Sequence, residues 1–159
     1  MTRLSRKPLL ALLLLYTALI LHGTLWPCNF DFGGEFVSKR VQVISWIPEV
    51  TDANRGGVVL DIVLNFTLFL PFGALAWLYR SKGAQPRRSA WVPALWGMIL
   101  SVSVETLQVW LPSRFPSATD VFTDTLGSLF GASATCVMVD SIGRRFPDSA
   151  NVARHRLPA

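Results

Sequence analysis

Four long apolar stretches constrain this chain more than any other feature of its sequence. They run over residues 8–26, 58–79, 90–111 and 117–139. Each is close to the ~20 residues that a helix needs to cross the hydrocarbon core of a bilayer. Only helices and closed barrels satisfy their backbone hydrogen bonds in lipid, and these stretches lack the alternation of barrel strands. The sequence therefore predicts an all-α membrane protein, a bundle of four transmembrane helices.

The composition agrees with a lipid environment. Hydrophobic residues make up 51% of the 159 residues and charged residues only 16%, whereas about a quarter of a soluble domain is charged. The formal net charge of +5 would suit nucleic acid. However, the aromatic residues lie inside the apolar stretches rather than between basic residues. We therefore expect membrane lipids, and no nucleic acid, as partners.

The first apolar stretch has an alternative interpretation as a signal peptide, because the basic segment MTRLSRK precedes it. The stretch is long for a signal peptide, and no small-x-small cleavage site follows it. The segment from Leu25 to Cys28 is no lipobox either, because Trp26 and Pro27 are too bulky. We expect a retained helix.

The basic residues predict the orientation. Eleven of the 15 Lys and Arg precede the first stretch, separate the second from the third, or follow the fourth. By the positive-inside rule, residues 1–7 form a cytoplasmic N-terminus and residues 140–159 a basic cytoplasmic tail. The membrane domain then covers residues 8–139 of a multi-pass protein of the cytoplasmic (inner) membrane. Cys28 and Cys136 lie at opposite faces, so we expect them not to pair.

Residues 27–57 form the predicted outer loop. Within it, Phe36, Val37, Val41, Ile44 and Ile47 repeat at roughly helical spacing. This pattern is typical of an amphipathic helix lying on the membrane surface. A short strand around Val41 to Ile44 is the alternative.

Four carboxylates fall inside the predicted helices: Asp61, Glu105, Asp120 and Asp124. A charge at the bilayer centre costs ~2.5–3.5 kcal/mol on insertion scales. Ionisable residues inside a membrane are for this reason candidates for a functional site.

These carboxylates share one depth with other polar residues. The predicted topology places His22 and all four carboxylates in the outer third of the membrane. Spacings of three or four residues put neighbours such as Asp61 and Asn65 on one helix face. Such faces turn toward each other or toward a wet cavity. We therefore predict an outward-open polar pocket. Its expected ligand-binding residues are Asp61, Asn65, Glu105, Gln108, Arg114, Asp120 and Asp124.

The inner halves of the helices carry two further features. Gly127 and Gly131 form a small-xxx-small pair, which lets helices approach closely. Pro71, followed by Phe72 and Gly73, is expected to kink or locally unwind the second helix, or only to adjust its packing.

Three motifs resemble the VanZ-like family, membrane proteins named for a teicoplanin-resistance protein. The motifs are Asp61-x3-Asn65-x5-Pro71-Phe72-Gly73, Ser101-x3-Glu105-x2-Gln108 and Arg114-x5-Asp120-x3-Asp124-x2-Gly127. The family usually has Asn where this chain has Asp124, so the substitution adds a carboxylate to the site. The resemblance implies a link to glycopeptide resistance of the teicoplanin type, although many relatives lie outside resistance clusters.

Three functions follow from this pocket. The first is binding of a cell-envelope lipid or glycopeptide-related ligand, with Arg114 as the clamp for an anion. The second is a membrane-embedded enzyme acting on a lipid-linked envelope substrate. Glu105 would be its general acid or base, with Asp120 as the other catalytic candidate and His22 as a helper. The third is a structural helix bundle held by interhelical hydrogen bonds. Carboxylates also suit a divalent cation, but we expect neither a metal nor another cofactor.

Overall fold

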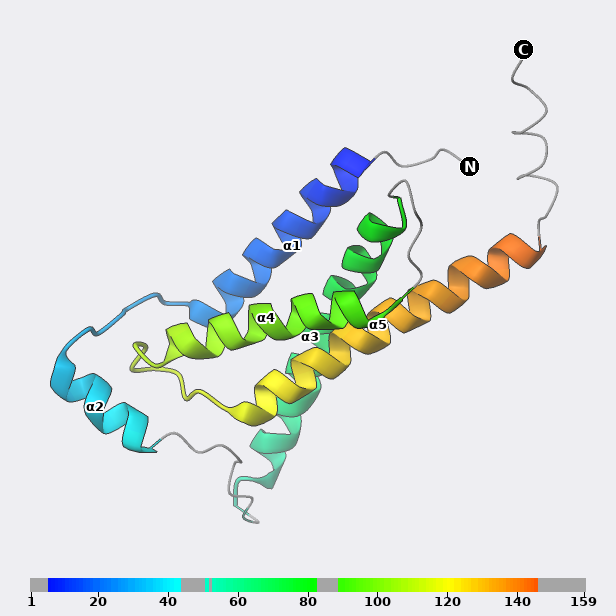
Figure 1. Ribbon diagram of the computed structural model, residues 1–159. Coiled ribbons are helices and arrows are strands. Elements are labelled where there is room, and N and C mark those ends of the chain that lie inside the picture. The colour runs from blue at the N-terminus through cyan, green and yellow to red at the C-terminus, as the bar shows by residue number, and fades with distance from the viewer. Residues whose placement is uncertain (1–5, 44–50, 52, 83–88, 146–159) are drawn as a thin grey trace.

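The computed structural model describes residues 6–43, 51, 53–82 and 89–145, and the described residues form five helices and no strand. The helices are α1 (Arg6–Leu25), α2 (Gly34–Val43), α3 (Arg55–Ser81), α4 (Trp91–Gln108) and α5 (Ala118–Arg145) (Figure 1). The prediction of an all-α protein is confirmed.

Helices α1, α3, α4 and α5 form the bundle and alternate in direction along the chain (Figure 1). Helix α5 packs most extensively against α3 and then against α4, whereas α1 rests mainly on α3. The start of α1 and the end of α5 lie at the same end of the bundle. Helix α2 lies beyond the opposite end, where α1 and α4 finish and α5 begins.

Three helices of the described chain are long and apolar enough to cross a membrane: α1, α3 and residues Ala118–Ile142 of α5. Helix α4 is shorter than its predicted stretch of residues 90–111, because the chain turns after Gln108. The prediction of membrane-crossing helices is thus confirmed, by length and composition, for three of the four.

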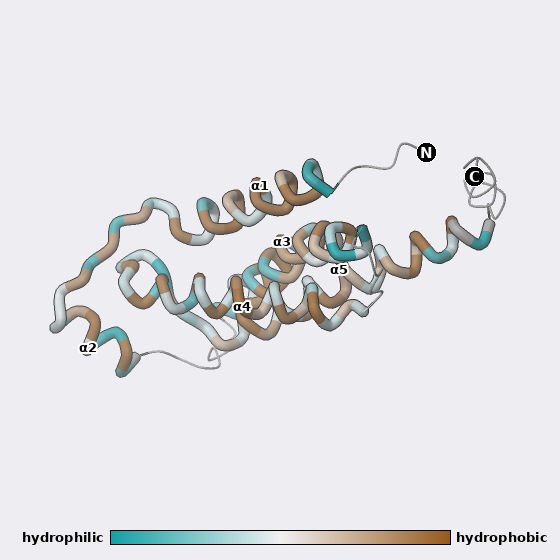
Figure 2. Tube along the Cα trace, turned by 45° about the horizontal axis from the view of Figure 1, so that its top comes forward, coloured by the Kyte–Doolittle hydropathy of each residue, from teal (hydrophilic) through white to brown (hydrophobic). Residues whose placement is uncertain are grey.

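Large apolar side chains cover the outside of the bundle. Leu15 of α1 is 68% exposed, and Val137 of α5 is 65% exposed. Figure 2 shows the hydrophobic residues running along the helices. Removing such a side chain from water stabilises a protein by about 1.5–3 kcal/mol. Outward-facing apolar side chains would forfeit this free energy in water, whereas lipid would cover them.

The core lies between α1 and α3. It contains Leu13 and Ile20 from α1 and Phe69, Phe72 and Ala76 from α3, all buried. Spacings of three, four and seven residues bring these side chains to one face of each helix. A second cluster of Leu25, Val104 and Leu111 closes the end of the bundle nearer to α2.

Helices α3 and α5 approach each other closely through small residues. A methyl group on Gly127 would overlap the carbonyl oxygen of Phe66, and one on Gly131 would overlap that of Leu70. On the other helix, a methyl group on Gly73 would overlap the backbone of Ser128. The structure therefore supports the close packing that the Gly127–Gly131 pair predicted.

Helix α3 continues through Pro71 without the local unwinding that was one of the predicted outcomes. The Tyr16 hydroxyl of α1 donates to the Leu68 carbonyl at 2.8 Å, in the turn just before the proline. Pro71 lacks a backbone N–H, and the helix stays regular around it while a neighbouring helix contacts the preceding turn.

The helix predicted within residues 27–57 is present as α2, and its described residues include Val41 to Val43, so the strand alternative is wrong for them. Ile44 and Ile47 lie outside the described residues. Cys28 and Cys136 are not joined by a disulfide, as predicted.

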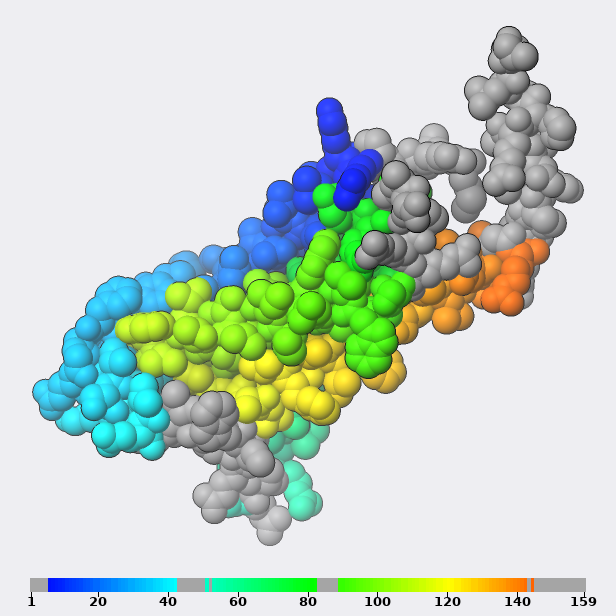
Figure 3. Space-filling model, in the orientation of Figure 1, coloured from blue at the N-terminus to red at the C-terminus, as the bar shows by residue number. Residues whose placement is uncertain are grey.

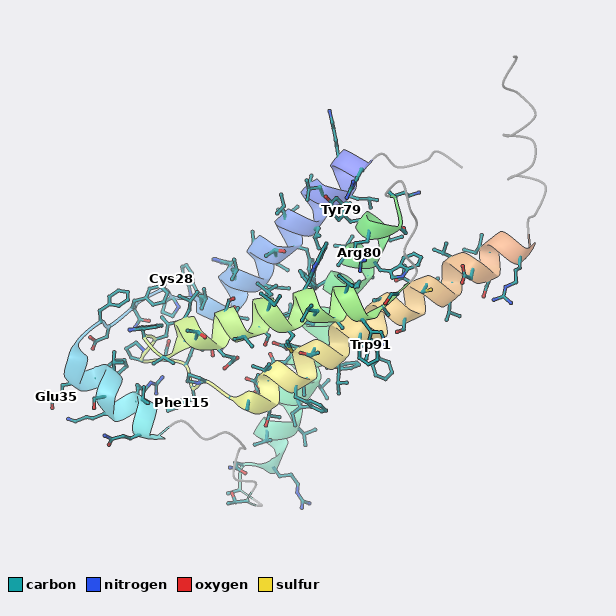
Figure 4. The ribbon with its side chains drawn as sticks, viewed as in Figure 1. Cys28, Glu35, Tyr79, Arg80, Trp91 and Phe115 are labelled. Carbon is teal, nitrogen blue, oxygen red and sulfur yellow. The ribbon has the colours of Figure 1, made fainter. Side chains whose placement is uncertain are left out.

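Basic and aromatic side chains meet at the end of the bundle that lies away from α2. The Arg6 guanidinium lies 4.7 Å from the ring centroid of Tyr79, and that of Arg80 lies 6.0 Å from Trp96. Figure 4 shows Tyr79 and Arg80 at the end of α3, near the start of α1. Aromatic and basic residues of this kind are enriched where a helix meets the membrane–water interface.

Candidate functional site

Asp124 and Ser101 form a buried pair between α5 and α4. The Ser101 hydroxyl donates to Asp124 Oδ2 at 2.6 Å. Asp124 is 4% exposed and Ser101 is 0% exposed. The site therefore contains a carboxyl group that is removed from solvent and held by a neighbouring helix.

Glu105 of α4 binds the start of α5. Its Oε2 accepts a hydrogen bond from the Ser117 backbone N–H at 2.7 Å. The Ser117 hydroxyl in turn accepts from the Thr119 N–H at 3.2 Å, as in a helix cap. A carboxylate beside the first turn of a helix also interacts favourably with the helix dipole. Glu105 thus fixes where α5 begins relative to α4.

Helix α3 adds two polar residues to the same region. Asn65 and Asp61 both interact with the Asp120 carboxylate of α5. Asp124 in turn interacts electrostatically with Asp120, Glu105 and Asp61. The structure therefore brings the four predicted carboxylates together where α3, α4 and α5 meet. Within the described residues, none of the four forms a salt bridge with a basic side chain.

Gln108 and Arg114 lie elsewhere, against α1. Gln108 Nε2 donates to the Thr24 carbonyl at 3.2 Å, and Arg114 Nη2 donates to the Gly23 carbonyl at 3.0 Å. Both side chains donate to carbonyl groups in the last turn of α1. The last carbonyl groups of a helix have no N–H partner within the helix. The seven predicted residues therefore divide into an acidic cluster (Asp61, Asn65, Glu105, Asp120 and Asp124) and a pair that holds the end of α1. His22, also on α1, is exposed and lies against Trp26, with ring centroids 5.2 Å apart and the rings tilted by 56°.

Arg40 of α2 is a residue that the sequence did not single out. Its Nη2 donates to the Leu111 carbonyl at 2.7 Å, and its guanidinium lies 4.4 Å from the ring centroid of Phe115. These contacts join α2 to the loop between α4 and α5. In the sequence, the signal that could have revealed Arg40 is a basic residue within the otherwise apolar repeat of the outer loop.

A groove with a volume of about 530 Å³ runs between α4 and α5, which lie side by side in Figure 3. Its walls are mainly apolar, and Glu105 and Ser117 are among the polar residues that line it. The other lining residues include Met98, Val102, Pro116, Val121 and Phe122. This cavity differs from the predicted polar pocket, because of the seven predicted residues only Glu105 lines it.

The acidic cluster is not arranged as a metal centre of the usual kind. Among the residues that the structure describes, no group of three or more His, Cys, Asp and Glu is placed to hold a metal ion. Oxygen-rich divalent sites need several converging ligands, and the four carboxylates do not converge in that way.

A bundle that contains three apolar helices long enough to cross a bilayer is typical of a membrane protein. The profile of the VanZ/LLP1 family matches residues 13–139, and the chain belongs to this family. The match confirms the resemblance carried by the three motifs. Neither a search of curated proteins nor a search of solved structures found a match.

Proposed function

We propose that this protein binds a lipid of the cell envelope in the groove between α4 and α5. The observation that carries the proposal is the groove itself, a cavity of about 530 Å³ with apolar walls and Glu105 among its lining residues. Volumes of roughly 300–1,000 Å³ are usual for sites that bind small molecules. Acyl or polyprenyl chains are the apolar ligands that a membrane supplies at such a surface.

The proposed orientation has α1, α3, α4 and α5 crossing the cytoplasmic membrane, with both termini in the cytoplasm. Helix α4 has 18 residues, which gives a length of about 27 Å at 1.5 Å per residue. That length is close to the ~30 Å thickness of the hydrocarbon core. The excess of basic residues supports a cytoplasmic position for the end that carries Arg6 and Arg80. The acidic cluster then lies in the outer half of the membrane.

The lipid chain would lie along Met98, Val102 and Phe122, and its polar part would reach Glu105 and Ser117. Arg114 does not line the groove, but it lies two residues before the groove residue Pro116, and it remains the proposed clamp for an anionic headgroup. One of its five N–H donors is used by the Gly23 carbonyl. The remaining donors suit a phosphate group.

Native mass spectrometry of the gently purified protein tests this proposal. Val102→Trp places a large ring in the groove, whereas Leu95→Trp is a matched control on an exposed part of α4 that does not line it. We expect the wild type and Leu95→Trp to retain one envelope lipid and Val102→Trp to lose it while staying folded. Retention of the same lipid by Val102→Trp, or only bulk phospholipid on the wild type, would contradict the proposal.

The proposal extends to teicoplanin, because that glycopeptide carries a lipid tail. We expect cells expressing the wild type to become less susceptible to teicoplanin, and cells expressing Val102→Trp to show no change. A glycopeptide without a lipid tail is the control, and susceptibility to it should not change. Equal effects on both antibiotics would rule out a role of the groove in resistance.

A second candidate function is an enzyme acting on the bound lipid, and the presence of Glu105 in the groove wall favours it. A carboxyl group beside a substrate is able to act as a general acid or base. Glu105→Gln keeps the oxygen that accepts from Ser117 but removes the ionisable group. Mass spectrometry of the products measures conversion of the lipid. A Glu105→Gln variant that retains the lipid but no longer converts it would support catalysis, whereas unchanged conversion would exclude Glu105 from the reaction.

A further inference from the structure

Two oxygen atoms in the interior of the bundle have no hydrogen-bond partner among the residues that the structure describes. They are Asp124 Oδ1 and Ser128 Oγ, and each is fully shielded from solvent. Asp124 is 4% exposed and Ser128 is 0% exposed. Buried polar groups in proteins are almost always paired, so two orphaned atoms on one helix require a physical explanation.

The two residues share one face of α5, because they are four positions apart. Each faces a residue of α4. Ser101 donates to Asp124 Oδ2, and a methyl group on Gly97 would overlap the Ser128 hydroxyl. Since Gly97 and Ser101 are also four positions apart, the two helices meet in register here. The three oxygen-bearing side chains of Ser101, Asp124 and Ser128 therefore lie along a single contact between α4 and α5.

This contact is closed on the side of α3. The Phe69 side chain is 1% exposed, and its Cδ1 would lie 3.7 Å from a Cβ built on Gly97. The space around the two orphaned oxygens is therefore narrow. It lies one to two helical turns further along α5 than Asp120.

The Asp124 carboxyl group lies among acidic neighbours. Asp124 forms no salt bridge with a basic side chain of the described residues, and the charged groups that act on it, Asp120, Glu105 and Asp61, are all acidic. A buried carboxylate is normally paired with a basic group, coordinated to a cation or neutralised by a proton. Acidic neighbours strengthen the attraction for a cation and offer nothing to an anion.

We propose that Asp124 and Ser128 bind a small monovalent cation, Na⁺, between α4 and α5, with Ser101 holding the second carboxylate oxygen. Carboxylate and hydroxyl oxygens are hard ligands of the type that hard cations prefer. A single positive charge neutralises the one carboxylate in direct contact. Divalent sites use several carboxylate ligands, and no group of three or more His, Cys, Asp and Glu of the described residues is placed to supply them.

Binding of ²²Na⁺ to the purified full-length protein, in nanodiscs of neutral phosphatidylcholine, tests the proposal. We expect saturable binding of about one ion per chain by the wild type. Binding should be lost in Asp124→Asn, which keeps the shape but removes the charge. It should weaken at least tenfold in Ser128→Ala, which removes one ligand. Glu35→Gln removes an exposed carboxylate on α2, and this control should bind as the wild type does.

Thermal unfolding at constant ionic strength supplies a second measurement. A ligand at 100 times its Kd lowers the ratio of unfolded to folded protein about 100-fold, so Na⁺ should stabilise the wild type relative to choline. Absence of ²²Na⁺ binding by the folded wild type overturns the proposal, and so does full binding by Asp124→Asn. If Asp124→Asn does not fold, the wild type and Ser128→Ala decide the question. Stability that rises with acidity but ignores Na⁺ would show a protonated carboxyl group and would also overturn it.

Discussion

Replacement of Gly73 by Ala should separate the two helices that pack most extensively in this bundle. A Cβ on Gly73 would lie 2.6 Å from the carbonyl carbon of Ser128 and closer still to its oxygen, whereas real Cβ contacts are essentially never under 3.0 Å. The obstacle is helix backbone and has no rotamer that relieves the overlap. Overpacking usually costs about 1–3 kcal/mol, and we expect about 3 kcal/mol here. The better helix propensity of Ala returns up to about 1 kcal/mol, so the net loss should be about 2 kcal/mol.

Gly57→Ala is the matched control on the same helix, because nothing lies within 4 Å of a Cβ at that position. It should keep or slightly raise the stability. The free energy of unfolding of both variants would be measured by titration with sodium dodecyl sulfate in mixed micelles, followed by circular dichroism. The reasoning predicts a difference of about 3 kcal/mol between the variants. Equal unfolding curves would refute the close approach of α3 and α5.

Three further predictions concern single hydrogen bonds. Glu105→Ala leaves the backbone N–H at the start of α5 without its acceptor and should lower the free energy of unfolding by about 2 kcal/mol. Glu105→Gln keeps an oxygen and should lower it by about half as much. Identical losses in the two variants would exclude the hydrogen bond as the cause. Ser101→Ala removes the donor to Asp124 and should lower the free energy of unfolding by about 1–3 kcal/mol. Ser103→Ala, on the exposed face of the same helix, should change it by less than about 0.5 kcal/mol. Thermal unfolding measures both variants. Arg40→Ala removes the hydrogen bond from α2 to the loop after α4 and should increase proteolytic cleavage of α2 several-fold without unfolding the bundle. Unchanged cleavage would show that other contacts hold α2.

Much of the acidic cluster was predictable, because helix geometry is local. Length and hydropathy placed Asp61, Glu105, Asp120 and Asp124 on three helices, and the alternation of those helices placed them at one depth. A rise of 1.5 Å per residue converts position in a helix directly into depth. The structure brings these residues together, as that arithmetic predicted.

The orientation of other polar residues depended on packing. Gln108 and Arg114 follow Glu105 closely in sequence, yet both bind carbonyl groups of α1 instead of facing the carboxylates. The turn after Gln108 decides the direction of Arg114, since a side chain beyond the end of a helix no longer follows the helical repeat. Gln108 is still part of α4, and the rotation of that helix turns its side chain toward α1. The sequence pattern shows which residues are polar and how deep they lie, but it does not show which neighbouring helix supplies their partners.

The sequence by itself determined the membrane class, the helical elements, the family motifs and the shared level of the carboxylates along the bundle, because each follows from hydropathy or from spacing along one chain segment. Only the tertiary structure decided that Gly73 faces the backbone of Ser128, that Glu105 caps α5 and that an apolar groove opens beside it. These features exist between helices. They depend on the rotation and register of each helix against its neighbours, which close packing sets and no single segment contains.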